Sequence, residues 1–422
     1  MEVREAPRRP NELLYDAVAC GMWLYTRAAF RVIVLGAPNV RLRPRLLLVS
    51  SHRSDSDVPL ICSTVFFGDR MWRRHHLRLH FAARDDLFVR GVLAGLAPDL
   101  SLPLRRLLFR VDPSPYLPRV RVNPIGSTTA VKAVQVLGLF PPSTPLDQAL
   151  PTPEVEHFRA HAESSALPAP VTVGDALRAE FAGLLWRDLD RGDLADPRYR
   201  PLWQLRARVS AADVRRVIAM LRDGEPLLLF PEGRPSPDGG LGPLRPGLGL
   251  LVRRGRPNLL LPFALAYDSL TRGRTLAYVS VGQPIPAPAD DVEEVVLAEL
   301  RRATPLTCGQ VVSHVLLRAA DADSGAVSAG GVERELRAAA GRARAERRPL
   351  DPMLAGRDSR RRRLSHCLAT LVRLGLLSTR DGRRLELDGH RIRSEPEILR
   401  LAREYESARE GVADQPAGER GD

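Results

Sequence analysis

The chain has 422 residues and a formal charge of +13, from 63 Lys and Arg against 50 Asp and Glu. This length allows a sizeable core with an accessory unit, and the positive charge predicts attraction to a polyanion: an anionic membrane, a nucleic acid or an acyl carrier protein. The four cysteines are scattered without C-x-x-C spacing, which argues against a zinc site and a disulfide framework and fits a reducing cytosol. No apolar run reaches the roughly 18 residues of a membrane-spanning helix, so an integral membrane protein is not expected.

Residues 11–35 are expected to form one amphipathic helix. Apolar side chains recur at helical spacing, while charged residues such as Asp16 and Arg27 prevent deep burial in lipid. Trp23 and Tyr25 beside arginines suit a helix lying on a membrane surface. A helix packed against the protein needs the same pattern, so both interpretations stay open.

The next predicted elements place a histidine and an aspartate beyond the end of a buried strand. Residues 46–49 form a short apolar run typical of such a strand, and a helix start is predicted between Ser54 and Asp57, with the helix continuing to Phe67. The spacing of His52 and Asp57 allows the carboxylate to accept from one ring nitrogen while the other acts as a base. Alone, this His-x4-Asp spacing is a weak signal.

Two further strands and an insertion are expected before residue 206. Apolar and basic side chains alternate through residues 77–81, and a second short strand is expected at 119–122, before a helix at 127–139. The Pro-rich stretch 141–205 predicts an insertion into the core, with a helix at 173–189. Its expected role is a lid, a partner surface or an elaborated loop.

A second strand end carries polar groups. A helix starting near Ser210 leads into an apolar strand at 227–230, which ends in Pro231, Glu232, Gly233 and Arg234. In open α/β sheets ligands bind in the crevice beyond the carboxyl ends of the strands. Strands at 259–266 and 276–281 are expected to complete the sheet.

From about residue 292 the sequence becomes rich in Arg and Ala, which predicts a mostly helical subdomain at 291–403. A helix, a turn and a hairpin around Asp381-Gly382 resemble a winged helix, so a DNA-binding role stands beside that of a helical accessory region. The expected organisation is an N-terminal helix at 1–35, a core at 36–290 with its insertion, the subdomain, and a disordered polar tail at 404–422.

Four short blocks occur in order along the chain: SHRSDSD at 51–57, FAARDDLF at 81–88, FPEGR at 230–234 and LPFA at 261–264. They resemble the NH-x4-D, F-x-A-K-x-E-L-F, F-P-E-G-T-R and V-P-V blocks of the glycerolipid acyltransferase superfamily, which includes the lysophosphatidic acid and glycerol-3-phosphate acyltransferases. The resemblance covers about residues 30–285. The sequence departs from the family pattern at Ser51, where Asn is usual, at the missing Thr before Arg234, and at Pro124, where Arg is usual.

The resemblance implies an α/β fold with an acyltransferase-type core sheet flanked by helices, and it implies O-acyltransferase activity. His52 would be the catalytic base and Asp57 the residue that orients it. The same resemblance implies substrate binding by Glu232, Gly233, Arg234, Arg245 and Arg84. Acyl-CoA or acyl carrier protein would be a co-substrate, so neither a cofactor nor a metal is expected.

The sequence therefore predicts transfer of a fatty acyl group to the hydroxyl of a glycerol phosphate or lysophospholipid, in phospholipid biosynthesis. The expected location is cytoplasmic, peripheral on the inner face of the cell membrane. One alternative is the same fold acylating another alcohol, such as a glycolipid or a polyketide. Another is a winged-helix-like DNA-binding regulator with a vestigial core; the intact His52 and Asp57 pair argues against it, and nucleic acid is not the expected partner.

Overall fold

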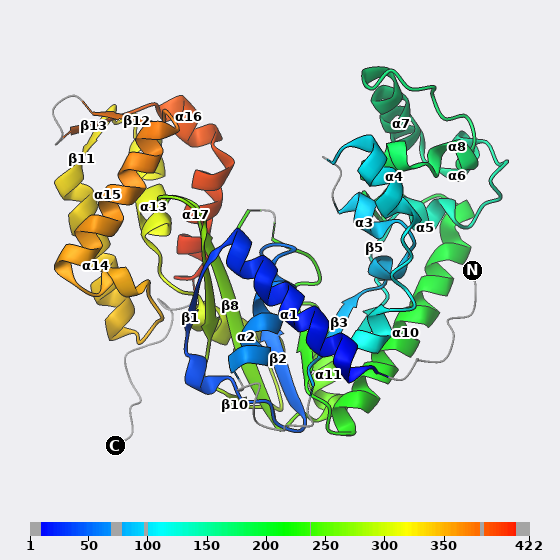
Figure 1. Cartoon of the computed structure of the whole chain (residues 1–422), viewed down its shortest axis with the longest axis horizontal. Coiled ribbons are helices and arrows are strands. Elements are labelled where there is room, and N and C mark those ends of the chain that lie inside the picture. Colours follow the sequence, from blue (N-terminus) through cyan, green and yellow to red (C-terminus); the bar gives the residue numbers. More distant parts are fainter. Residues whose placement is uncertain (1–9, 69–77, 97–99, 237, 380–383, 411–422) are drawn as a thin grey trace. The chain divides into compact units, whose positions relative to one another are not determined.

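The structure is a computed structural model that describes residues 10–68, 78–96, 100–236, 238–379 and 384–410 (Figure 1). The chain divides into two compact units: unit 1 contains residues 1–16 and 80–220, and unit 2 contains residues 17–79 and 221–422. The fold is mixed α/β with a mostly parallel sheet flanked by helices, as the sequence predicts.

The sheet of unit 2 is built on buried apolar strands. Their order is β1 (Arg31–Leu35), β9 (Leu276–Val281), β8 (Leu259–Asp268), β2 (Leu46–Ser50) and β7 (Leu227–Leu229), with β10 (Ile285–Pro286) also paired to β8. β2 runs parallel to both β7 and β8, whereas β8 and β9 are antiparallel. Every residue of β2 is buried, because a strand covered on both faces requires a continuous apolar run.

The expected single helix at 11–35 is wrong in its last part. Helix α1 spans Glu12–Ala29, and the chain then forms β1, whose sequence RVIVL pairs in parallel with β9. β-Branched residues fit a pleated, half-buried surface, so the apolar pattern continues while the backbone changes from helix to strand. The remaining helices of the sheet region are α2 (Asp57–Gly68), α11 (Gly247–Gly255) and α12 (Val292–Ala303), the last packed against β8.

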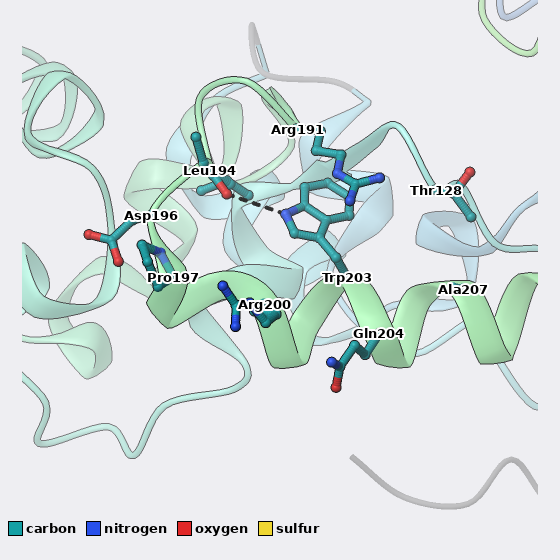
Figure 2. Close-up of a pocket in the computed structure, with 10 residues that line it drawn as sticks. Thr128, Arg191, Leu194, Asp196, Pro197, Arg200, Trp203, Gln204 and Ala207 are labelled. Atoms are coloured by element: carbon teal, nitrogen blue, oxygen red, sulfur yellow. Dashed lines mark hydrogen bonds between the residues drawn. The ribbon is translucent and has the colours of Figure 1, made fainter.

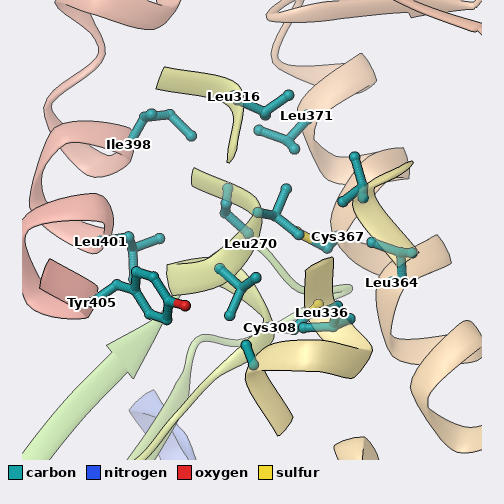
Figure 3. Close-up of a cluster of buried hydrophobic side chains, with 14 of the residues drawn as sticks. Leu270, Cys308, Leu316, Leu336, Leu364, Cys367, Leu371, Ile398, Leu401 and Tyr405 are labelled. Atoms are coloured by element: carbon teal, nitrogen blue, oxygen red, sulfur yellow. The ribbon is translucent and has the colours of Figure 1, made fainter. Parts of the chain in front are cut away.

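The C-terminal part of unit 2 has the element order of a winged helix. Its helices are α13 (Cys308–Asp321), α14 (Ala329–Ala345), α15 (Arg357–Arg373), α16 (Gly389–Ser394) and α17 (Pro396–Ser407). A small antiparallel sheet has the order β11 (Ala326–Ser328), β13 (Arg384–Leu387), β12 (Leu377–Thr379). Figure 3 shows the apolar core between these helices, with Leu316, Leu336, Leu371 and Leu401 among its members.

Unit 1 combines two short strand pairs with many short helices. The strands are β3 (His80–Arg84) parallel to β4 (Val122–Ile125), and β5 (Ala130–Lys132) antiparallel to β6 (Asp188–Asp190). The helices are α3 (Val92–Gly95), α4 (Leu102–Arg110), α5 (Ala133–Leu137), α6 (Leu146–Ala149), α7 (Thr152–Ser164), α8 (Val173–Ala176), α9 (Ala182–Leu185) and α10 (Arg200–Arg222).

Several expected elements of unit 1 are wrong. The stretch 119–122 is mostly a 3-10 turn, and the stretch 127–139 contains a strand and then a short helix. The stretch 173–189 is broken into short helical turns, and α10 begins ten residues before Ser210. Asp213 was expected to mark the start of a helix, but it lies within α10. Its carboxylate accepts a hydrogen bond from Gly126 N at 3.1 Å, so it serves a tertiary contact and not a helix cap. The strand expected at 77–81 is β3, which begins later, at His80. Residue 77 lies outside the described residues.

The two compact units do not follow the expected domain boundaries. Residues 141–205 are not a separate insertion, because Phe158 and Trp203 share one core with Val92 and Val131. The C-terminal part has a core of its own, which Leu270, just after β8, joins. The tail expected to be disordered from 404 is helical to 407; residues 411–422 lie outside the described residues.

Candidate active site

The strand pairing of unit 2 brings the two predicted motifs together. β2 and β7 are parallel neighbours, so the residues that follow them meet at the same edge of the sheet. The backbone N–H of His52 donates to Glu232 Oε1 at 2.9 Å, and His52 O accepts from Ser236 N at 2.9 Å. The ring of Phe230 stacks on the His52 ring with centroids 4.4 Å apart. The segment after β2 and the segment after β7 are therefore joined around His52 by hydrogen bonds and ring stacking.

Asp57 fixes the orientation of the His52 ring. The distance from His52 Nδ1 to Asp57 Oδ2 is 2.9 Å, and Asp57, the first residue of α2, is fully buried. Its Oδ2 also accepts from the backbone N–H groups of Arg53 and Ser54. Because a carboxylate only accepts, Nδ1 carries the proton, and Nε2 is left with a lone pair that can remove a proton from a substrate.

Tyr267 is part of this site and was missed in the sequence. Its hydroxyl donates to Asp57 Oδ1 at 2.6 Å from near the end of β8, which lies beside β2. Burial and the negative charge of Asp57 raise the pKa of Tyr267 far above its usual value, so the phenol stays a donor. The only signal in the sequence is a polar residue at the end of an apolar strand, and nothing local links it to Asp57.

Glu232 joins the two loops. Besides the His52 N–H, its carboxylate accepts from Gly242 N at 3.2 Å, and the residue is 7% exposed. Burial raises the pKa of Glu232, and the nearby Arg53 guanidinium opposes that effect. In this geometry Glu232 shapes the loop beside His52 by binding backbone groups of the protein.

Gly233 and Arg245 complete the turn after β7. Gly233 has a φ of +76°, which favours glycine, and its N–H donates to Phe230 O at 3.0 Å. Arg245 N donates to Pro231 O at 2.8 Å, so the end of the loop contacts its beginning. Both Arg245 and Arg234 are exposed, and both provide positive charge at the candidate site.

Helix α17 contacts the loop between β7 and α11, residues 230–236 and 238–246, which is called the Glu232 loop here. Ser407 Oγ accepts from Leu241 N at 2.9 Å. At Gly239, whose φ is +82°, a Cβ would lie 2.6 Å from Arg400 O, so the loop approaches the helix closely. The Arg53 guanidinium donates to the carbonyl oxygens of Gly239 and Gly240. The loop is therefore held between the His52 segment and α17.

Arg400 of α17 also binds the strand that carries Tyr267. Its Nη2 donates to Tyr267 O at 2.8 Å, and its Nε donates to Glu397 Oε2 at 2.9 Å. Its Nη1 donates to the buried Glu404, whose other oxygen accepts from Gln310 Nε2 at 3.0 Å. One guanidinium therefore connects α17 to the end of β8.

Arg84 lies in unit 1, at the end of β3. Its guanidinium is 2.6 Å from Asp188 Oδ1 and 3.2 Å from Asp86 Oδ2. Lys132 Nζ joins this ion cluster at 3.2 Å from Asp188 Oδ2. The predicted contact of Arg84 with substrate therefore stays a prediction, and in unit 1 the residue belongs to an ion-pair cluster.

A surface cavity of about 610 Å³ also lies in unit 1 (Figure 2). Figure 2 shows Trp203 at its centre; the indole Nε1 donates to Leu194 O at 3.3 Å, and Arg191 lies over the ring at 5.8 Å. None of the predicted site residues lines this cavity. In the part of the chain that the structure describes, no group of His, Cys, Asp and Glu is placed to hold a metal ion.

No model of a known protein family matches the chain, and no curated protein matches it. Among solved structures, the chain is similar to the 1-acyl-sn-glycerophosphate (LPA) acyltransferase PlsC from Thermotoga maritima, with 14% sequence identity, coverage of 70% of this chain and 81% of that chain, and a TM-score of 0.34. This is a distant likeness that by itself assigns neither an activity nor a residue role to the chain.

Proposed function

We propose that the protein is an acyltransferase that moves a fatty acyl group from a thioester donor to the hydroxyl of a glycerol phosphate or lysophospholipid. The observation that supports this most is the hydrogen-bonded series Tyr267, Asp57, His52, in which Asp57 is fully buried and the His52 side chain is 16% exposed. A buried orienter behind a solvent-accessible imidazole is the arrangement that general-base catalysis needs.

In the proposed reaction, His52 Nε2 takes the proton of the acceptor hydroxyl while the hydroxyl oxygen attacks the thioester carbonyl. Asp57 stabilises the imidazolium that forms. The tetrahedral intermediate then collapses, the carbon–sulfur bond breaks, and the proton passes from His52 to the departing thiolate. No acyl-enzyme is required, and acyl-CoA or acyl carrier protein serves as a co-substrate.

The acceptor's phosphate would bind the exposed arginines of the Glu232 loop. Arg234 and Arg245 both lie on this loop, and a guanidinium can bind phosphate with two parallel hydrogen bonds. Their position also suits another anionic alcohol. A panel of glycerol phosphate, lysophospholipids and uncharged alcohols therefore serves to identify the acceptor.

The test is release of free thiol from acyl-CoA and acyl carrier protein donors in the presence of this panel. His52→Ala is expected to lower turnover by about 10²- to 10⁴-fold, the usual contribution of a general base. His157→Ala, which removes an exposed histidine of unit 1, is the matched control and should keep wild-type turnover. Near-normal turnover in a folded His52→Ala protein would refute the proposal.

A second candidate function is binding of duplex nucleic acid by the C-terminal part of unit 2. The order α13, β11, α14, α15, β12, β13 favours it, because in a winged helix the third helix enters the major groove. Arg357, Arg362 and Arg373 are exposed on α15. Fluorescence anisotropy with labelled duplex DNA tests this; binding that weakens with salt and is lost in Arg362→Ala/Arg373→Ala would support it, and absence of binding would remove it.

A further inference from the structure

Helix α4 of unit 1 presents an exposed apolar stripe. Leu104 and Leu107 are three residues apart on α4, which places them on one face of the helix, and Leu100 and Val111 flank its two ends; these four residues are called the α4 stripe here. Their side chains are exposed, with Leu107 at 60% and Leu104 at 41%. None of the nine residues of α4 is buried.

The opposite face of α4 is fixed against the protein. Phe109 contacts the Trp186 ring edge to face, with centroids 6.3 Å apart. It also lies so close to Gly91 that a Cβ there would be 2.9 Å from its ring. Arg106 Nε donates to Glu180 Oε1 at 2.9 Å. Because these contacts set the rotation of the helix, the apolar stripe faces outward as a consequence of packing.

Exposed apolar residues are concentrated around this stripe. Of the sixteen exposed large apolar side chains in the described part of the chain, six lie between Leu96 and Tyr116. Exposed apolar side chains gathered in one segment indicate a contact surface on a protein, whereas single exposed leucines do not. Arg110, in the last turn of α4, is exposed and adds positive charge near the stripe.

We propose that the α4 stripe is the surface by which the protein docks on an anionic lipid bilayer. Exposed leucines would enter the boundary between headgroups and acyl chains, while Arg110 would meet the lipid phosphates. An anionic bilayer fits both the exposed leucines and the chain's formal charge of +13. This proposal does not depend on acyl transfer, because binding is measured without substrates.

Helix α1, the anchor expected from the sequence, is the rival surface. Its Trp23 packs against the protein, with its ring tilted against that of Phe67 and the centroids 5.3 Å apart. Leu13 and Leu24 remain exposed on α1, at 84% and 62%. A variant of these two leucines therefore distinguishes the two helices.

The experiment is co-sedimentation of the full chain with vesicles of phosphatidylcholine, alone or mixed with phosphatidylglycerol. Leu104→Ser/Leu107→Ser is expected to lower the partition coefficient on the mixed vesicles by about tenfold or more, since binding scales with buried apolar area. The matched control is Leu250→Ser/Leu399→Ser, which changes leucines of unit 2 that are 41% and 40% exposed and should bind as the wild type does. Circular dichroism confirms that each variant is folded.

Stronger binding to the mixed vesicles than to phosphatidylcholine alone, reduced by high salt, is the expected charge dependence. Wild-type binding by the Leu104→Ser/Leu107→Ser protein would overturn the proposal, as would loss of binding confined to Leu13→Ser/Leu24→Ser. Size-exclusion chromatography adds one more outcome. A wild-type dimer that the stripe variant dissociates would show that the stripe joins two copies of the chain, and it would also overturn the proposal.

Discussion

At the residue scale, the candidate site is centred on Asp57, whose two carboxylate oxygens bind His52 and Tyr267. His52, Asp57 and Glu232 could be predicted because each lies just beyond an apolar strand, and the structure brings them together. Tyr267 could not, because it meets Asp57 only through the pairing of β2 with β8, and the two residues are 210 positions apart. The role of Glu232 could not be predicted either, since its backbone partners are set by the tertiary fold.

Replacing Tyr267 by Phe removes the donor to Asp57 Oδ1 and leaves the ring in place. We expect turnover to fall by about tenfold, because the orientation of Asp57, and through it of His52, becomes less fixed. The loss is expected in kcat more than in the KM of either substrate, because the change acts on the orientation of the catalytic base.

Steady-state kinetics that separate kcat from KM check this, with Tyr116→Phe as the control, because Tyr116 is an exposed tyrosine of unit 1. An unchanged kcat, or a loss confined to KM, would show that Tyr267 has no positioning role.

His80 should make the protein less stable as the pH falls. Burial and the neighbouring Arg121 guanidinium lower the pKa of His80 from 6.5 to about 3. Between these pH values the unfolded chain binds a proton that the folded chain does not. The contribution of His80 to the free energy of unfolding is therefore complete above pH 6.5 and is lost as the pH falls, by at most about 1.4 kcal/mol per pH unit.

Urea unfolding at several pH values measures this slope. His80→Gln, which cannot titrate, should flatten it between pH 3 and 6.5, whereas His157→Gln, at an exposed position of the same unit, should keep the wild-type slope. An equally steep slope in His80→Gln would assign the effect to another group.

At the element scale, the buried strands of unit 2 were the most predictable part of the fold. Continuous apolar runs identified β2, β7, β8 and β9, because strands covered on both faces tolerate few polar residues. The break between α1 and β1 was not predictable, since helix and strand are equally compatible with the apolar sequence after Phe30. Pairing with β9 decides it, and that partner lies more than 240 residues away.

Removing Arg400 from α17 should loosen the candidate site without unfolding unit 2. Arg400→Ala loses the bond to Tyr267 O and the packing beside Gly239, so the Glu232 loop should exchange amide hydrogens faster. Turnover is expected to fall by about 10- to 100-fold, because a small displacement of a catalytic group lowers the rate by factors of this size.

The matched control is Arg391→Ala on α16, whose guanidinium also donates to two backbone carbonyls, those of Leu374 and Gly375. Hydrogen exchange followed by mass spectrometry reports on residues 236–242 directly. Equal exchange and equal turnover in the two variants would contradict a positioning role for α17.

At the scale of the whole molecule, the division into two units was not predictable from composition or periodicity. Pro-rich sequence at 141–205 is typical of an insertion, yet its apolar side chains build the core of unit 1. The change to Arg- and Ala-rich sequence near residue 292 is typical of a new domain, yet buried ion pairs join this part to the sheet. Such pairings depend on long-range contacts that no local pattern records.

Arg363 of α15 is the centre of that connection. It is 1% exposed, and it binds Asp268 at the end of β8, Asp351, and Leu270 O. Arg363→Met leaves two buried carboxylates without their cation, so we expect a loss of about 3–5 kcal/mol in the free energy of unfolding.

Arg362→Met, at the adjacent exposed position, should change the same quantity by less than about 0.5 kcal/mol. Guanidinium chloride unfolding measures both variants. Similar stabilities for the two would mean that the C-terminal part does not depend on this ion pair.

The cluster of Arg84, Asp86, Asp188 and Lys132 has a practical consequence. Lys132 is the one lysine of the sequence, so an amine-directed reagent has a single side-chain target. Its ammonium is held by Asp188 and is 14% exposed. The rate at which a succinimidyl ester acylates Lys132 therefore reports on the opening of unit 1. Followed as the mass increment of the peptide that contains Lys132, which excludes the reactive N-terminal amine, this rate would separate the unfolding of that unit from the rest of the chain in a denaturant series.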